Sequence, residues 1–434
     1  MTEIGYTADS YGAVSWSTFG LDEEDNPDLH FPASVAVYRR MRREETQLQS
    51  VLKAVKLPIL RTDWRLDTRG VDPEVASFVS RNLGVPLDVE AEEGRPVRSR
   101  GRFSWHEHLN LALTSLDFGF SVFEQVYQYR EDGRLWLKKL GYRPQGSINR
   151  IEVDRDGGLV SVEQHLGGKR GARMGVDRLV VYTHEREGAN WTGTSLLRSS
   201  YKYWLLKDRL LRVQAVTVER NGLGVPIYEA SPRLDDGSLS SEEMIAREKT
   251  EISDGQKIAS GLRAGEHSGA SIPNGAKLTM NGVTGQLPDA SKPIEYYDQQ
   301  MAKSALAHFL TLGTQTGSWA LGTTFADFFT MSLQTVAKDL AEVATAHIIE
   351  DLVDLNFGED VPAPRLTFDE IGSQNPPTAQ ALQSLVQTGV IRPDDILEAF
   401  MRRRHGLPEA DHDTAREIGA LNLPTEGHND DGNE

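Results

Sequence analysis

The sequence predicts an α+β protein in which an antiparallel sheet region precedes several long helices. Five apolar, β-rich stretches lie between residues 119 and 184, and short glycine-containing connections separate them, which favours hairpins over helical crossovers. Farther along, apolar side chains recur at three- and four-residue spacings over 195–221, 291–312 and 325–355, as expected for long helices. The chain of 434 residues, 38% of them hydrophobic, is long enough for two or three domains with buried cores.

Composition argues against several functional classes. The chain carries 47 basic and 64 acidic residues, and the resulting net charge of -17 argues against a protein that holds nucleic acid by neutralising many phosphates. Cysteine is absent, which excludes disulfides, thiolate metal ligands and a cysteine nucleophile. Because the sequence has neither an apolar run of about 18 residues nor an N-terminal export signal, we expect a soluble, unexported protein without a membrane role.

The first part of the chain predicts a mixed domain over residues 35–190. Residues 1–34 are polar and acidic, so we expect an arm that is ordered only by a partner. The pattern then predicts a helix from Val35 to about Val55, a strand over 57–68, a helix from Asp72 to Leu83, and a helix from the Ser104–Glu107 capping box to about Asp117. The strands follow over 119–130, 134–143, 147–154, 159–165 and 178–184.

The helix predicted over 195–221 has two distinct faces. Thr194 or Ser195 can cap its start, and Asn221-Gly222 suits its end. Two adjacent apolar columns and a basic edge run along it. They consist of Leu197, Trp204, Leu211 and Val218 in the first column, Leu196, Tyr203 and Leu210 in the second, and Arg198, Lys202, Arg209, Arg212 and Arg220 on the edge.

A small α/β insertion, residues 222–290, follows this helix. We expect strands over 224–231 and 271–282, and a helix between them that a capping box at Ser240–Glu243 opens and that breaks near Asp254-Gly255. The segments after the insertion are predicted as a second long helix (291–312) that carries Tyr297 and Met301, a glycine-rich loop (313–324), a third long helix from Phe325 to Leu355, two short helices (376–388 and 393–404), and an acidic, disordered tail (406–434).

Motifs for catalysis or cofactor binding are missing from the sequence. It has no phosphate-binding GxxxxGK[ST] loop and no Gly-x-Ser-x-Gly elbow. His106 and His108 point to different faces of a helix, which favours a capped helix start over a metal site. We therefore expect no catalytic residues, no metal and no cofactor. The polar loop His184–Trp191 could hold an acid/base pair, but a solvated charge cluster is favoured there.

Two basic segments could contact nucleic acid, or they could be an ordinary surface loop and an ordinary packing hairpin. The loop 92–102 holds four arginines, and a solvated loop is favoured over a nucleic-acid contact. The two short helices near the C-terminus have the order of a helix-turn-helix motif, but Asp394 and Asp395 at the start of the second helix would repel phosphate. A packing hairpin whose final arginines, Arg402 to Arg404, complement the helix dipole is favoured.

Three sequence segments and the order of the predicted parts are similar to those of a known protein family. Residues 191–208, 259–278 and 320–358 resemble the Mu-like branch of the portal proteins of tailed bacteriophages, and the similarity runs from about Pro58 to Asn356. The family implies a non-catalytic ring, usually a dodecamer, at one capsid vertex, through which double-stranded DNA is packaged and ejected. It also implies the terminase large subunit, head-completion or adaptor proteins, and the major capsid and scaffolding proteins as partners, in the host cytoplasm during assembly and then in the virion.

The resemblance implies a portal-type fold for the individual segments. The implied parts are a wing (35–190 with 325–375), stem segments (191–221 and 291–312), a clip (222–290), a tunnel loop (313–324) and a crown (376–405). The tunnel loop would face DNA with Gln315, Thr316, Ser318 and Trp319. The stem would contact other subunits through Leu197, Trp204, Arg209, Leu211, Arg212, Val218, Tyr297 and Met301, with Glu295 or Asp298 of the next subunit opposite the basic edge.

Two alternatives stay open on the sequence alone. The first is a minor capsid or adaptor protein that binds a portal without lining a channel, and it predicts no ring of this chain by itself. The second is an enzyme with its site at His184–Trp191, and it predicts an activity that is lost on substitution of His184 and Glu187 while assembly persists.

Overall fold

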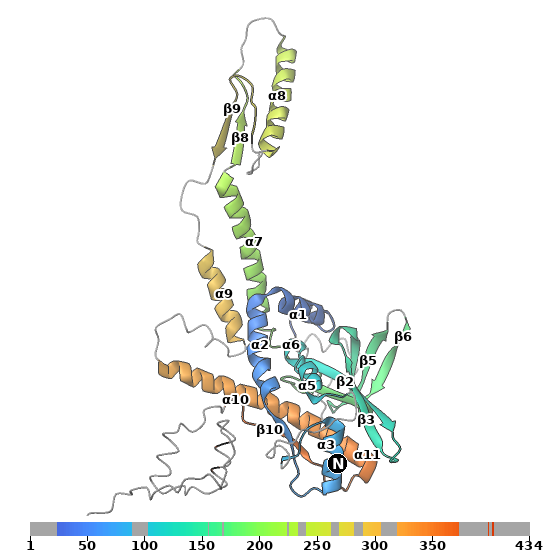
Figure 1. The fold of residues 1–434 in the computed structure, drawn as a ribbon. Coiled ribbons are helices and arrows are strands. Elements are labelled where there is room, and N and C mark those ends of the chain that lie inside the picture. The colour runs from blue at the N-terminus through green and yellow to red at the C-terminus, as the bar shows by residue number, and fades with distance from the viewer. Residues whose placement is uncertain are drawn as a thin grey trace, which may run out of the picture. The chain divides into compact units, whose positions relative to one another are not determined.

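Four small antiparallel sheets and a set of long helices make up the fold, which confirms the predicted α+β class (Figure 1). The computed structural model describes residues 24–88, 103–154, 156–166, 169–223, 225–232, 240–261, 269–281, 290–304 and 319–372, together with positions 398 and 402. The chain divides into two units, Met1–Ile371 and Gly372–Glu434. The two predicted short helices and the tail fall in the second unit, almost entirely outside the described residues.

Part of the predicted N-terminal arm packs on its own chain. Leu29, in a short 3-10 helix (η2, Pro27–Leu29), is buried, and the hydroxyl of Tyr201 donates a 2.7 Å hydrogen bond to Asp28. Glu24 forms an ion pair with Arg198. The expectation of an arm that needs a partner is therefore wrong for the part after residue 23, because the chain itself supplies the apolar contact and the cation. The residues before Glu24 lie outside the described part.

Two helices, α1 (Ala33–Glu44) and α2 (Thr46–Arg61), follow, and the second occupies half of the predicted strand. The apolar residues of α2 keep a helical spacing through Ile59, which is completely buried, so the helix continues beyond the predicted end. Strand β1 is limited to Trp64–Asp67, and it pairs antiparallel with β10 (Arg365–Phe368). The first half of the predicted strand is therefore wrong.

Side-chain caps determine where the next helices begin. α3 (Pro73–Leu83) is capped by Asp72, as predicted. α5 (Trp105–Ala112) begins after Ser104, whose Oγ accepts a 3.3 Å hydrogen bond from the backbone N–H three residues later. The chain then turns into a separate short helix, α6 (Ser115–Phe118), so the single helix predicted here consists of two pieces.

The predicted strand region forms two three-stranded sheets. Strand β2 (Phe120–Tyr129) is central in the first, between β3 (Leu135–Arg143) and β7 (Leu179–Thr183). The second has the order β4 (Ile148–Val153), β5 (Leu159–Leu166) and β6 (Lys169–Gly175). All pairings are antiparallel, as the short connections predict. The sequence does not predict β6, because it has no β-branched or aromatic residue.

Strand β2 has both faces buried and thereby joins two apolar cores. Phe123 belongs to a core with α2, α3, α5 and the last helices of the unit, whereas Phe120 and Val122 belong to a core with α1. The second core also includes Trp204 and Met301 from the two long helices after the sheets. The base of that helix pair is therefore anchored in the sheet domain.

A long helical segment completes the first unit. α10 (Trp319–Ala344) continues through a π-helical turn (η6, Thr345–Glu350) into α11 (Asp351–Phe357), and Gly358 ends it with a φ of 104°. The predicted third helix is confirmed, but it begins at Trp319 instead of Phe325. The last six residues of the loop predicted over 313–324 are therefore helical, and its first six lie outside the described residues.

Candidate functional site

Two long helices flank the small insertion, as predicted. α7 (Tyr201–Leu223) and α9 (Ser291–Lys303) lie side by side (Figure 1). α7 does not begin near Ser195 as predicted, because the Ser195 hydroxyl donates a 2.6 Å hydrogen bond to the carbonyl of Asp117 and holds the preceding turns against the sheet domain. Residues 305–312, the expected second half of the other helix, lie outside the described residues.

The contact between α7 and α9 uses the second of the two predicted apolar columns. Half-buried residues lie on both sides of the buried Lys207 at spacings of three and four, which is the pattern of a helix contact. They are Tyr203, Leu210, Gln214 and Thr217. Tyr203 packs on Tyr297 of α9 with ring centroids 6.3 Å apart. Tyr297, predicted to contact another subunit, therefore has a partner within the chain.

The first predicted column divides into a buried base and an exposed upper part. Leu197 and Trp204 are buried in the second core, and Met301 of α9 is completely buried in the same core. These three are core residues of their own chain, which corrects their prediction as subunit contacts. By contrast, Leu211 is 43% exposed and Val218 is 63% exposed, so large apolar side chains face solvent in the isolated chain.

One buried cation, Lys207, joins three segments at the base of the pair. Its Nζ donates hydrogen bonds to Oε1 of Glu45 (2.7 Å), between α1 and α2, and to Oδ1 of Asp298 on α9 (2.6 Å). Burial lowers the pKa of Lys207, but the two carboxylates outweigh burial and the pKa is raised. Sequence reasoning does not single out Lys207, although a lone charge within a stripe of apolar and aromatic residues is a usable signal.

Two of the five residues of the predicted basic edge form ion pairs within the chain. Arg198 is paired with Glu24, with Nη2 2.7 Å from Oε1, and Arg212 pairs at 2.8 Å with an aspartate one turn earlier in α7. Asp298, one of the two acidic residues expected opposite the basic edge of the next subunit, pairs with Lys207 of its own chain, and the contact of Glu295 stays a prediction. Arg209 is exposed.

In the part of the insertion that the structure describes, a two-stranded sheet is accompanied by one helix. β8 (Val225–Glu229) and β9 (Lys277–Asn281) pair antiparallel, and α8 (Ser241–Gly261) packs along β8 (Figure 1). The predicted capping box is confirmed, since the N–H of Ser240 donates to Glu243 Oε2 at 2.9 Å and the N–H of Glu243 donates to Ser240 Oγ at 3.3 Å.

The predicted break of α8 at Gly255 is wrong, because the helix continues to Gly261. A Cβ added to Gly255 would lie 2.1 Å from the ring of Tyr228 on β8. This glycine therefore permits close contact between helix and strand and does not end the helix.

The predicted DNA-facing residues lie mostly outside the described part. Gln315, Thr316 and Ser318 are not among the described residues, and Trp319 is the first residue of α10, so its backbone is helical and not part of a loop. Their contact with DNA stays a prediction.

The polar loop that begins at His184 is bonded to the sheet domain. The indole N–H of Trp191 donates a 2.9 Å hydrogen bond to the carbonyl of Gly157, and the guanidinium of Arg186 lies 4.3 Å from the Trp191 ring centroid. Burial lowers the pKa of His184, although the carboxylate of Glu185 opposes this shift. The described contacts of this loop are therefore structural, and the shift of the His184 pKa is toward the neutral imidazole.

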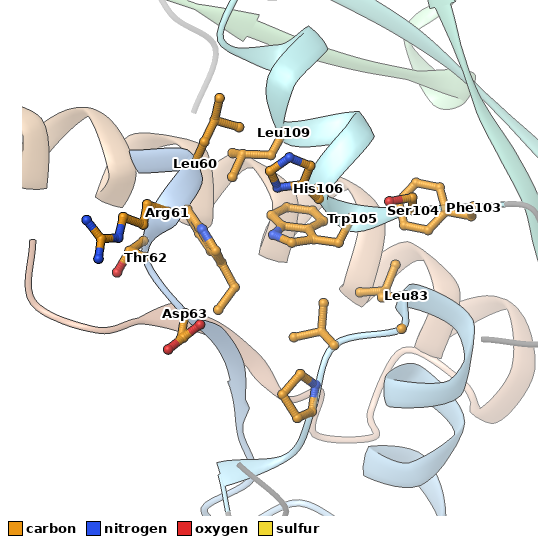
Figure 2. A pocket seen from close by; sticks show the side chains of 14 residues that line it. Leu60, Arg61, Thr62, Asp63, Leu83, Phe103, Ser104, Trp105, His106 and Leu109 are labelled. Atoms are coloured by element: carbon orange, nitrogen blue, oxygen red, sulfur yellow. The ribbon is translucent and has the colours of Figure 1, made fainter. Parts of the chain in front are cut away.

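A surface pocket of about 440 Å³ lies between the end of α2 and the start of α5 (Figure 2). The buried indoles of Trp64 and Trp105 line it, with ring centroids 5.5 Å apart, and His106 is exposed at its edge. His108 is instead buried in the core, which confirms that the two histidines point apart. None of the predicted site residues lines this pocket.

Within the ranges given above, no group of three His, Asp or Glu side chains is arranged to hold a metal ion. Among the same residues, no helix is long and apolar enough to cross a membrane.

The fold resembles chains in gene transfer agent particles. A chain in the virion of a native gene transfer agent particle is 11% identical, with a TM-score of 0.51 over 88% of this chain and 95% of that chain. Chains in the neck of the native particle, computed with C12 symmetry, and of the empty particle, computed with C6 symmetry, have the same TM-score at 11% and 12% identity. They cover 87% of this chain and 95% and 94% of their own length. At these identities the likeness shows the fold.

A family model supplies the assignment that the fold alone does not. No curated protein sequence matches the chain. The model described as the portal protein of Mu bacteriophage, however, matches residues 35–407, which is most of the chain. The chain therefore belongs to the family of Mu bacteriophage portal proteins, which are structural connector proteins and not enzymes.

Proposed function

We propose that copies of this chain assemble into a closed ring that forms the portal channel at one vertex of a phage capsid. The observation that best supports assembly is the exposure of Leu211 and Val218 in the upper part of the first apolar column of α7. Large apolar side chains in solvent are stabilised by burial against a neighbour. A ring supplies a neighbour on each flank of every copy through one repeated heterologous contact.

We assign the parts of the subunit as follows. The proposed ring has about twelve copies, the symmetry of the native gene transfer agent neck. Its parts are the wing (35–190 with 325–375), the stem (191–221 and 291–312), the clip (222–290) and the crown (376–405). Gln315, Thr316 and Ser318, with Trp319 at the following helix start, face double-stranded DNA.

The charge of the chain supports a channel through which DNA slides. With a net charge of -17, each copy offers few cations for phosphates, so DNA is not held by release of many counterions. The terminase large subunit and later the head-completion proteins dock on the clip, and the major capsid and scaffolding proteins surround the ring. The ring forms in the host cytoplasm and remains in the virion at the portal vertex.

Purified protein tests this proposal directly. Negative-stain microscopy and light scattering should show rings with a central hole and the mass of many copies. Replacing Leu211 and Val218 with Glu should shift the mass toward the monomer. Val176→Glu is the matched control, because Val176 is 46% exposed in the sheet domain, outside the helix pair. This control should leave rings intact.

Two results would overturn the proposal. One is a monomer at every protein and salt concentration. The other is a protein that joins a particle only when a separate portal is supplied, which would indicate an adaptor. Loss of assembly in both the α7 variant and the control would mean that added charge, and not the apolar column, controls assembly.

A further inference from the structure

The clip has almost no core of its own. Among the described residues from 225 to 281, only Gly255 is fully buried. Two paired strands are marginally stable in water, and a unit this small needs a helix, a metal or a partner to cover its apolar surface. α8 covers only one face of the sheet. The clip is therefore incomplete in a single copy.

The sheet of the clip has one face without a helix among the described residues. Tyr228 points toward α8, where its ring meets Gly255. Because successive side chains of a strand alternate, Ile227 and Glu229 point to the opposite face, and their cross-strand partners are Thr279 and Lys277. Ile227 is 41% exposed there. This second face, centred on Ile227, is the bare sheet face.

The outer flank of α8 carries a second exposed apolar surface. Met244, Glu248 and Glu251 lie on the less exposed side of the helix, whereas Ile245 and Ile252 are 48% and 52% exposed. These two isoleucines are seven residues apart, so they line up along the helix at a distance of about 10 Å. Lys249 lies between them on the same flank. We call this surface the α8 flank.

We propose that the α8 flank of one subunit packs on the bare sheet face of the next subunit around the ring, with Lys249 opposite Glu229. The inference rests on the proposed ring and names a contact within it. Both surfaces have an exposed isoleucine at their centre. The bare sheet face carries Glu229 beside its cross-strand partner Lys277, and the α8 flank carries Lys249, which is opposite in charge to Glu229. A second copy of the chain brings both surfaces to the contact through one repeated arrangement. Successive copies cover both, and closure of the ring leaves neither exposed.

The absence of cysteine makes this contact testable by cross-linking. The natural chain has no thiol, so introduced cysteines are the only ones present. Ile227→Cys and Ile252→Cys chains are mixed, assembled and mildly oxidised. A disulfide requires Cα atoms within about 7 Å, so a covalent heterodimer supports the contact. The matched control is Ile272→Cys in place of Ile252→Cys, since Ile272 is an exposed isoleucine outside both surfaces, and it should give no heterodimer.

A charge exchange tests the proposed ion pair independently. Glu229→Lys and Lys249→Glu should each lower the cross-linked fraction about two- to fivefold, the range for an exposed pair. The double variant should restore it. Within one subunit the two residues lie on opposite sides of the sheet, so a defect in the fold of the clip would persist in the double variant.

Light scattering on the same samples separates this inference from the proposed ring. Intact rings without the 227–252 cross-link, or with cross-links between two copies of residue 252, would overturn the contact alone. Absence of rings in every sample would overturn the ring and this contact with it.

Discussion

The imidazole of His108 lies in the core of the sheet domain, with Nε2 2.8 Å from the hydroxyl of Tyr182. Burial lowers its pKa to about 3, so the ring is neutral at every physiological pH. The spacing from His106 predicts that the two rings point apart, but not that one of them is a neutral core residue. That fact depends on the packing of α5 against β2 and β7, and the residue pattern around His108 does not show this packing.

The buried imidazole predicts a pH dependence of stability. An unfolded chain protonates His108 below a pH of about 6.5, whereas the folded chain does so only near pH 3. Between these values the unfolded state binds more protons, so stability falls as the pH falls. From pH 6.5 to 5 the loss attributable to His108 is at most about 2 kcal/mol. His108→Gln should reduce the pH slope of urea unfolding over this window, and an unchanged slope would contradict the prediction.

Removal of the Lys207 ammonium should destabilise the base of the helix pair. Lys207→Met leaves Glu45, itself 7% exposed, without its cation. We expect the free energy of unfolding to fall by about 2 kcal/mol, less than for a fully buried pair because Asp298 is partly exposed. Lys202→Met, at an exposed position of the same helix, should change it by less than about 0.5 kcal/mol in chemical denaturation. Equal effects would refute a special role of Lys207.

At the scale of elements, periodicity predicts α7 well and its contacts poorly. The heptad spacing of Leu197, Trp204, Leu211 and Val218 identifies a helix with an apolar column. It does not show that the column is buried at its base by the sheet domain and exposed above it. The same limit applies to α2, where alternation near Trp64 suggests a strand while apolar residues at helical spacing continue to Ile59. Tertiary burial decides between such patterns.

The close contact of α8 with β8 gives a paired glycine prediction. Gly255→Ala should loosen the clip, although alanine favours a helix by about 1 kcal/mol, because its Cβ would overlap the ring of Tyr228. Gly261→Ala in the same helix meets nothing within 4 Å and should be neutral or stabilising. Hydrogen exchange of residues 225–231 should quicken only in the first variant. Faster exchange in both would indicate a general effect on the helix.

At the scale of the whole molecule, the described chain between Lys207 and Met301 buries no hydrophobic side chain. The order of sheet domain, long helix, small insertion and second long helix follows from the sequence, because turn residues and changes of periodicity mark each boundary. Ring formation does not follow from one chain, because in the proposed ring the surfaces that bury Leu211 and Ile227 belong to another copy. The isolated sequence shows such side chains only as apolar residues in helices and strands.

The exposed cations of α7 predict a charge-sensitive assembly. Each copy carries a net charge of -17, so copies repel one another and the stem needs local attraction. Arg209→Glu with Arg212→Glu should lower the assembled mass at a given concentration, most strongly at low salt. Lys138→Glu with Lys139→Glu makes the same charge change on exposed positions of β3 and should have less effect. Intact rings with altered DNA passage would instead assign the arginines to the channel.

The bond network of Lys207 also bears on the order in which the chain folds. Glu45 lies 162 residues before Lys207, and Asp298 lies 91 residues after it. During synthesis the sheet domain and α7 emerge first, and the ammonium then has one carboxylate until the clip and the start of α9 have been made. The second bond therefore closes late in folding. A chain that stops before Asp298 lacks the second bond, and its Lys207 is then held by Glu45 alone.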